Sequence, residues 1–246
     1  MMKVSFVIPA HNEEVCLPKC LESVLKEVER SGLAAEIVVV NNTSTDRTRE
    51  VAERFPGVRV VDEPVKGLTH ARAAGMRATD GELIANIDAD TMPPPGWLTT
   101  VAEEFSKDPR LVALSGPFIY YDLSPFSRAL VRLFYGVGYL THLFNHYVLH
   151  TGAMLQGGNF VIRRDAFKGV GGFDTTIAFY GEDTDVARRL SKVGRVLWTW
   201  KLPMYSSGRR LKAEGVVMTG WRYTLNYLSV LLLKRPVTKV YSDIRK

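Results

Sequence analysis

Two aspartates, Asp88 and Asp90, stand one residue apart at the end of a largely apolar run over residues 83–87. Three prolines follow at residues 93–95, and the strand must end before them because proline cannot donate to a strand ladder. Alternation aims both carboxylates the same way, and like charges repel unless a cation lies between them. Hard oxygen ligands in this number suit Mg²⁺ or Mn²⁺ bridging to a diphosphate. A solvated Asp-x-Asp turn is the competing interpretation.

Composition and charge narrow the class of protein. The 246 residues are 46% hydrophobic and 24% charged, which suits one large α/β domain or a domain with an appendage. The net charge of +6 comes without a basic-aromatic motif, so nucleic acid is not an expected partner. Basic residues instead flank a late apolar segment, where anionic lipid or a sugar-nucleotide diphosphate accounts for them better. They are Arg209, Arg210, Lys212, Lys234, Arg235, Lys239, Arg245 and Lys246.

The two cysteines point to a reducing compartment. Cys16 and Cys20 lie four residues apart in an expected helix, with no nearby His or Cys to complete a metal site. We therefore expect free thiols in a cytoplasmic protein. Residues 1–9 have the pattern of a strand rather than of a signal peptide.

Strand-like runs alternate with helical periodicity in the first half of the chain. Strands are expected at residues 4–8, 37–40, 58–61 and 83–87, with helices at residues 17–28, 46–55 and 71–78. Asp46 is expected to cap the second of these helices. This order predicts a Rossmann-like, mostly parallel α/β sheet flanked by helices. Such sheets bind ligands at the carboxyl ends of their strands.

The second half predicts a longer strand at residues 111–120 and an amphipathic helix over residues 126–150. A strand, a helix and another strand follow at residues 157–162, 184–193 and 195–198, before an apolar segment at residues 216–233. A boundary is expected near Ser124 and Pro125. His142, His146 and His150 recur four apart, but they continue a polar stripe and indicate a surface or interfacial helix better than a metal site.

Four polar segments fall at expected element ends: residues 9–14, 41–46, 88–90 and 181–185. Topology alone brings the first three to one edge of the sheet, which predicts a nucleotide pocket with a metal beside it. In this order and spacing, over residues 3–210, the segments resemble those of family 2 glycosyltransferases with the GT-A fold. The resemblance implies an inverting transfer of a sugar from a nucleotide-diphosphate sugar, with a divalent cation.

The resemblance places Pro9, His11 and Glu13 in the nucleoside pocket. Asn42 falls where the family usually has an Asp that accepts a base N–H, and since an amide also donates, the nucleobase stays open. Arg72 resembles a position near the nucleotide, with a surface arginine as the alternative.

Asp88 would approach the ribose or the metal, and Asp90 would bind the metal directly. Asp183 is the expected general base, which takes the proton of the acceptor hydroxyl. Glu182 would raise the pKa of its neighbour or bind acceptor hydroxyls. The alternative for both is an acidic helix N-terminus.

The acceptor side is assigned by the same resemblance to Gly157, Gly158 and Asn159. Many relatives have a metal-binding His near residues 206–210, and this chain has none there. Arg209 and Arg210 would instead clamp the diphosphate, with phosphates and waters completing the metal site.

The apolar segment at residues 216–233 carries a polar stripe of Thr219, Arg222, Asn226 and Ser229. A spanning helix would bury that stripe in lipid, so we expect a helix that lies in the interface or packs on the domain. Peripheral attachment to the anionic inner face of the cell membrane follows, in a cell-envelope polysaccharide or glycolipid pathway.

Together these features predict a nucleotide-sugar-binding half at residues 1–124 and an acceptor-side half of the same domain at residues 125–210. Residues 211–246 form an apolar and basic C-terminal helix. The predicted function is transfer of a sugar to a sugar or lipid-linked acceptor. A metal-dependent nucleotidyltransferase and a noncatalytic nucleotide-sugar-binding protein are the alternatives.

Overall fold

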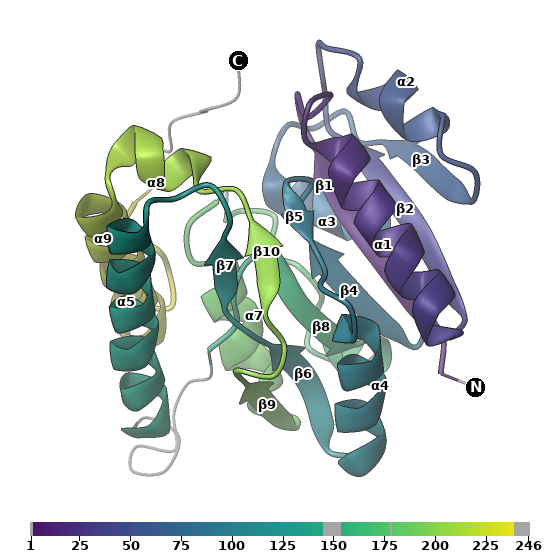
Figure 1. The fold of residues 1–246 in the computed structure, drawn as a ribbon. Coiled ribbons are helices and arrows are strands. Elements are labelled where there is room, and N and C mark those ends of the chain that lie inside the picture. The colour runs from purple at the N-terminus through teal and green to yellow at the C-terminus, as the bar shows by residue number, and fades with distance from the viewer. Residues whose placement is uncertain (1, 145–153, 178, 239–246) are drawn as a thin grey trace.

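The computed structural model describes residues 2–144, 154–177 and 179–238, and a seven-stranded sheet forms its central layer (Figure 1). The strand order is β3-β2-β1-β4-β8-β6-β9. Strand β8 runs antiparallel to both of its neighbours, and the other pairs are parallel, so the predicted mostly parallel α/β sheet is confirmed. The strands are β1 (Val4–Ala10), β2 (Ala35–Asn41), β3 (Val58–Asp62), β4 (Leu83–Ile87), β6 (Leu111–Ser115), β8 (Asn159–Arg163) and β9 (Arg195–Trp198).

Helices cover both faces of this sheet, because the strands are apolar on both sides. In β1, Phe6 and Ile8 pack in the core cluster that contains α1 and α4, whereas Val7 packs in the cluster that contains α6 and α7. Asp46 accepts the backbone N–H of Thr48 at 2.9 Å, but the N-cap residue of α2 is Arg47, so Asp46 lies one residue before the predicted cap position. The covering helices are α1 (Leu17–Ser31), α2 (Thr48–Glu53), α3 (Leu68–Arg77), α4 (Trp97–Lys107), α6 (Arg164–Gly169) and α7 (Glu182–Leu190).

A second, three-stranded sheet lies beside the first, in the order β5-β10-β7. Its strands are β5 (Thr91–Met92), β10 (Met204–Ser206) and β7 (Phe118–Tyr120). The prediction of one strand over residues 111–120 is therefore wrong, since β6 and β7 belong to different sheets. The chain turns at Gly116, where a Cβ would overlap the backbone of Leu202, and at Pro117, which has no N–H for a ladder.

The remaining helices are α5 (Pro125–Phe144), α8 (Arg209–Glu214) and α9 (Val216–Leu233). Helices α5 and α9 run side by side (Figure 1) and meet where Gly220 lies under the ring of Phe134. The expected helix over residues 126–150 is thus present up to Phe144, whereas His146 and His150 lie outside the described residues. In the described part of the chain, no helix is long and apolar enough to cross a membrane.

Candidate active site

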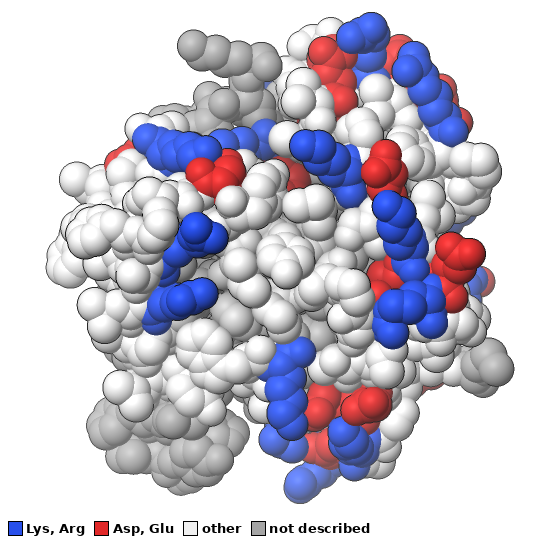
Figure 2. Space-filling view, in the orientation of Figure 1, with Lys and Arg blue, Asp and Glu red and all other residues white. Residues whose placement is uncertain are grey.

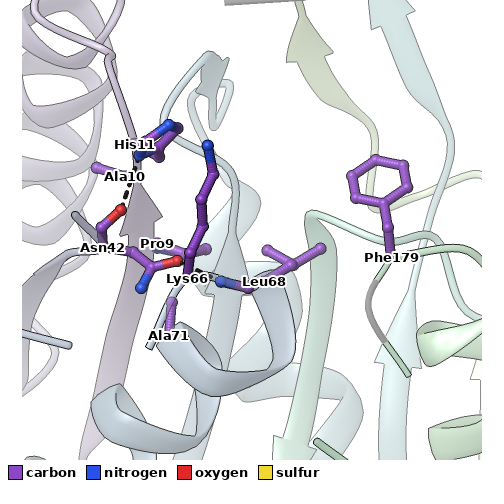
Figure 3. Close-up of a pocket in the computed structure, with 9 residues that line it drawn as sticks. Pro9, Ala10, His11, Asn42, Lys66, Leu68, Ala71 and Phe179 are labelled. Carbon is purple, nitrogen blue, oxygen red and sulfur yellow. Dashed lines mark hydrogen bonds between the residues drawn. The ribbon is translucent and has the colours of Figure 1, made fainter. Parts of the chain in front are cut away.

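The loops after β1 and β2 form one wall of a small cavity at the carboxyl edge of the sheet (Figure 3). The side chain of His11 bonds through Nδ1 to the carbonyl oxygen of Asn42 at 2.8 Å, which ties the two loops together. Phe179 lies across the cavity from them (Figure 3). The lining residues are Pro9, Ala10, His11, Asn42, Lys66, Gly67, Leu68, Ala71 and Phe179.

The amide of Asn42 is engaged by the protein itself. Its Oδ1 accepts the N–H of Gly67 at 2.8 Å, and its Nδ2 donates to the carbonyl oxygens of Glu63 at 2.9 Å and Val65 at 2.8 Å. Asn42 thereby holds the loop that brings Lys66 to the cavity. The resemblance predicts a contact between this amide and a nucleobase. In the structure, three hydrogen bonds to the protein itself position the amide.

A larger cavity adjoins the first at Leu68 and Phe179, and it contains the acidic residues. Asp88, Asp90, Glu182 and Asp183 all line it. These four residues come from the loop after β4 and from the start of α7, which topology brings to the same edge. The other lining residues are Leu68, Arg72, Phe118, Tyr120, Gln156, Gly157, Phe179, Tyr180, Gly181, Ser206, Ser207, Arg210, Leu211, Thr219 and Tyr223.

Arg72 is the central cation of this cavity. It is fully buried, so the alternative of a surface arginine is wrong. Its Nη2 lies 3.0 Å from Asp88 Oδ1, its Nη1 bonds to Glu182, and its guanidinium lies 5.2 Å from the ring centre of Phe160. One buried arginine thus holds two carboxylates from different elements in place.

Burial changes the proton affinity of the two neighbouring acids on α7. It raises the pKa of Glu182 to about 7, against the opposing charge of Arg72. It also raises the pKa of Asp183, although Asp183 accepts the backbone N–H of Gly157 at 2.9 Å and of Thr184 at 2.8 Å. A carboxylate with a raised pKa that opens to a cavity is suited to accept a proton.

Asp90 is balanced by a second arginine. Arg209 Nε lies 3.0 Å from Asp90 Oδ2, and Arg209 also bonds twice to Glu13, with 3.0 Å between Nη1 and Oε2. Burial acts to lower the pKa of Arg209, but the charge of Asp90 and the bonds to Glu13 together raise this pKa above its usual range. The carboxylate of Glu13 thus holds Arg209 and lines neither cavity, so its placement in the nucleoside pocket stays a prediction.

The sequence predicted a cation between the two aspartates, and the structure balances each aspartate with its own guanidinium. Within residues 2–144, 154–177 and 179–238, no group of three His, Cys, Asp or Glu side chains could hold a metal alone. Asp88 and Asp90 nevertheless line one cavity, and Mg²⁺-type ions often use one or two carboxylates with phosphates and water. The oxygen donors therefore fit a metal that arrives with a diphosphate.

Arg210 also lines the acidic cavity, as expected for a diphosphate ligand. Its guanidinium lies 4.7 Å from the ring centre of Phe179 and bonds to Glu214 at 2.7 Å. It therefore stands at the junction of the two cavities.

The start of β8 has two different roles. Gly157 lines the cavity, and Gly158 has φ +79°, with no room for a Cβ beside the carboxylate of Asp88. Asn159, in contrast, is fully buried and donates to the carbonyl oxygens of Gly116 at 3.0 Å and Leu202 at 2.9 Å. Its assignment to the acceptor is wrong, because its side chain joins the two sheets.

Several residues that line the two cavities were not predicted from the sequence. Phe179 and Tyr180 directly precede Gly181, and an aromatic pair beside an acidic segment was the available signal. Lys66 and Tyr223 had no such signal, since nothing in their local sequence distinguishes them from surface residues.

Comparison with known proteins identifies the family of this chain. The family model described as glycosyl transferase family 2 matches residues 5–171. The probable glycosyltransferase YdaM of Bacillus subtilis is 28% identical over 204 residues, covering 78% of this chain and 47% of that protein. The dolichyl-phosphate beta-glucosyltransferase ALG5D of Trichomonas vaginalis is 31% identical over 149 residues, covering 55% and 46%. The chain thus spans less than half the length of these curated relatives.

Solved structures share the fold. The mannosyltransferase PcManGT of Pyrobaculum calidifontis, in complex with GDP-Man and Mn²⁺, superposes with a TM-score of 0.64 at 22% identity, covering 87% of this chain and 62% of that one. An α/β fold with an acidic cavity at its strand ends defines the class as a GT-A transferase. The chain belongs to glycosyl transferase family 2.

Proposed function

We propose that this glycosyltransferase is inverting and transfers a sugar from a nucleotide-diphosphate sugar to an acceptor hydroxyl. Asp183 carries the proposal, since it is a half-buried carboxylate with a raised pKa that faces the same cavity as Asp88 and Asp90. The acceptor oxygen forms the new bond to the anomeric carbon, the bond to the diphosphate breaks, and the acceptor proton passes to Asp183. Glu182 keeps Arg72 in place beside this centre.

The donor would lie across both cavities. The smaller cavity, with Pro9, His11 and Asn42, would take the nucleoside, and the junction near Arg210 would take the diphosphate. Arg209 would help to bind the diphosphate once it leaves Asp90. Asp90 and Asp88 would then hold Mg²⁺ or Mn²⁺, which neutralises the charge that builds on the leaving diphosphate. The Mn²⁺ and GDP-Man of the mannosyltransferase complex support this assignment.

The acceptor is proposed to be lipid-linked, and the site to work at the inner face of the membrane. The name of the Trichomonas relative includes a dolichyl phosphate, which is a membrane lipid. The exposed apolar residues of α5 and α9 support the same assignment, because large apolar patches mark interaction sites.

A ligand screen tests the donor assignment. We expect one of UDP, GDP, CDP and TDP to raise the melting temperature more than the others when Mg²⁺ or Mn²⁺ is present, because binding stabilises the native state. Asp90→Ala should remove the metal-dependent part of this shift and abolish metal-dependent turnover of the matching nucleotide sugar. Val193→Ala, at an exposed residue outside both cavities, is the control.

The reaction products distinguish a glycosyltransferase from the two alternative functions. A glycosyltransferase releases a nucleoside diphosphate, a nucleotidyltransferase releases pyrophosphate, and a binding protein releases neither. Wild-type metal dependence in Asp90→Ala would show that the metal assignment is wrong.

A further inference from the structure

A third cavity, of about 550 Å³, runs as an apolar groove between α5 and α9. Among the described side chains that line it, one is charged, and that residue is Asp183. The groove wall is otherwise formed by aliphatic and aromatic residues such as Val131, Phe134, Leu155 and Trp221, with a few uncharged polar groups. A groove of this composition favours a hydrocarbon ligand over a polysaccharide, which needs many polar partners.

The groove and the acidic cavity are continuous. Six residues line both of them: Tyr120, Gln156, Gly181, Asp183, Leu211 and Tyr223. The groove therefore ends at the carboxylate that is placed to accept the acceptor proton. Any molecule in the groove presents its inner end to that carboxylate.

A buried hydroxyl near this end supports a polar head group. Thr219 is fully buried and lines the acidic cavity, and its Oγ1 has no hydrogen-bond partner among the described residues. A buried polar atom without a partner is costly, so a ligand that bonds to it gains affinity.

We propose that the groove between α5 and α9 binds the hydrocarbon chain of an amphiphilic acceptor, whose head-group hydroxyl reaches Asp183. This inference rests on the proposed function. A hydroxyl suits this end better than a phosphate, because Asp183 is the one charged side chain among the described residues of the groove, and its carboxylate would repel an anionic nucleophile.

The outer end of the groove fits the same ligand. Apolar side chains of both helices that line the groove are exposed, including Val137 on α5 and Trp221 and Leu228 on α9. Figure 2 shows few charges over this part of the surface, on the left of the view. A chain that leaves the groove therefore meets an apolar surface, which suits a lipid still partly held in a membrane.

Two glycines of α5 allow a matched test. Gly138 lines the groove, and a Cβ there has only Met154 Sδ within 4 Å, at 3.7 Å, so a larger side chain would enter the groove. Gly136 does not line the groove, and its Cβ position has no described atom within 4 Å. Both replacements should leave the helix intact, since glycine is the weaker helix former.

Binding of methyl, hexyl, octyl and decyl β-D-glucoside, each below its micelle concentration, is measured by calorimetry without donor. We expect the affinity to rise by up to about fourfold for each methylene of the longer chains. Gly138→Leu should weaken decyl glucoside binding at least tenfold, Gly138→Ala should weaken it less, and Gly136→Leu should not change it. A retained thermal shift with nucleotide shows that each variant is folded.

Equal affinity for methyl and decyl glucoside would overturn the proposal, as would equal losses in Gly138→Leu and Gly136→Leu. Decyl phosphate that binds in the groove more tightly than decyl glucoside would overturn the hydroxyl head group. Because these measurements need no donor, failure of the groove is distinguishable from failure of the transferase, which shows as absent nucleotide-sugar turnover.

Discussion

Two arginines, Arg72 and Arg209, determine how the acidic residues of the site are arranged. Each guanidinium binds two carboxylates: Arg72 joins Asp88 to Glu182, and Arg209 joins Asp90 to Glu13. Each pair joins carboxylates that come from different elements of the fold. The pairs therefore hold these side chains in fixed orientations before any ligand arrives.

Asp183→Asn tests the general base. We expect transfer to fall by about two to four orders of magnitude, the range for loss of general base catalysis, while nucleotide binding stays nearly unchanged. Steady-state transfer and nucleotide titration are compared with Asp185→Asn, since Asp185 lies on the same helix and binds Arg188 and Arg189 instead. A parallel loss of donor affinity and transfer in Asp183→Asn would assign this residue to nucleotide binding.

Glu182 makes stability depend on pH. Its pKa rises from 4.5 to about 7 on burial, so the folded protein holds this proton more tightly than the unfolded chain. That contribution is present below about pH 4.5 and is lost as the pH rises through about 7. We expect Glu182→Gln to reduce the fall in unfolding free energy between pH 5.5 and 8 by about 1–3 kcal/mol.

Urea unfolding of both proteins at the two pH values measures this difference. Asp183 remains in the variant, and its charge is one cause of the raised pKa of Glu182, so the measured difference includes the interaction between the two acids. An identical pH dependence in wild type and Glu182→Gln would show that Glu182 is not protonated in this range.

At the residue scale, the sequence predicted the acids better than their partners. Asp88, Asp90 and Asp183 stand out because each carboxylate follows or begins a regular element. The contact between Glu13 and Arg209 joins residues 196 positions apart, and local patterns contain no information about such a pair. The prediction that Asn159 binds the acceptor failed for a related reason. The local sequence, an amide after two glycines, does not indicate whether the side chain faces a ligand or the core.

At the element scale, the antiparallel strand β8 positions the glycines of the site. Because β8 runs opposite to β4, its first residue pairs with Ile87 at the end of β4. Gly157 and Gly158 therefore enter the carboxyl edge beside Asp88 and Asp183. A parallel strand would have brought its last residues there instead.

Gly158→Ala tests this placement. The new methyl group would overlap the carboxylate of Asp88, so we expect loss of nucleotide and metal binding by tenfold or more and a lower melting temperature. Gly172→Ala is the matched control, since Gly172 also has positive φ, of 70°, but open space around its Cβ position. Gly172→Ala should lower the free energy of unfolding by about 1 kcal/mol, the cost of backbone strain at a positive φ, and should leave ligand binding unchanged. Equal ligand binding in both variants would contradict the role of Gly158.

Elements were predictable wherever hydrophobic periodicity was continuous. The bounds of α9 match the predicted segment, and the first four strands of the sheet follow their apolar runs. The split between β6 and β7 did have a local signal, since Ser115, Gly116 and Pro117 interrupt the apolar run and a Gly-Pro pair is typical of a turn. The close approach of Leu202 to Gly116, together with the missing N–H of Pro117, explains why the chain leaves the first sheet there.

At the scale of the whole molecule, α9 faces the protein with its polar residues. Thr219, Asn226 and Ser229 are buried, whereas Trp221 and Leu232 are exposed by 60% and 79%. The polar stripe noted in the sequence therefore does not oppose a membrane contact, because the side facing away from the protein is apolar. Lys234 and Arg235 follow directly and add attraction to anionic lipid, about 1 kcal/mol each near a charged surface.

We expect the protein to float with anionic vesicles in a density gradient, less so at high salt and with neutral vesicles. Trp221→Ser with Leu232→Ser should reduce flotation several-fold, because both side chains would enter the lipid interface. Val15→Ser with Val193→Ser, at exposed residues outside α5 and α9, should not change it. Equal failure to float with both vesicle types would leave α9 as a helix that only packs on the domain.

The ion pairs of the site also determine when it can form during folding. Arg72 and Glu182 are 110 positions apart, and Glu13 and Arg209 are 196 apart, whereas β1 and β2 pair through a much shorter connection. Contacts between distant segments form slowly, because the chain loses loop entropy before it gains the contact. In refolding, the helical signal should return before nucleotide binding, and a nascent chain would have no complete active site until Arg209 has emerged.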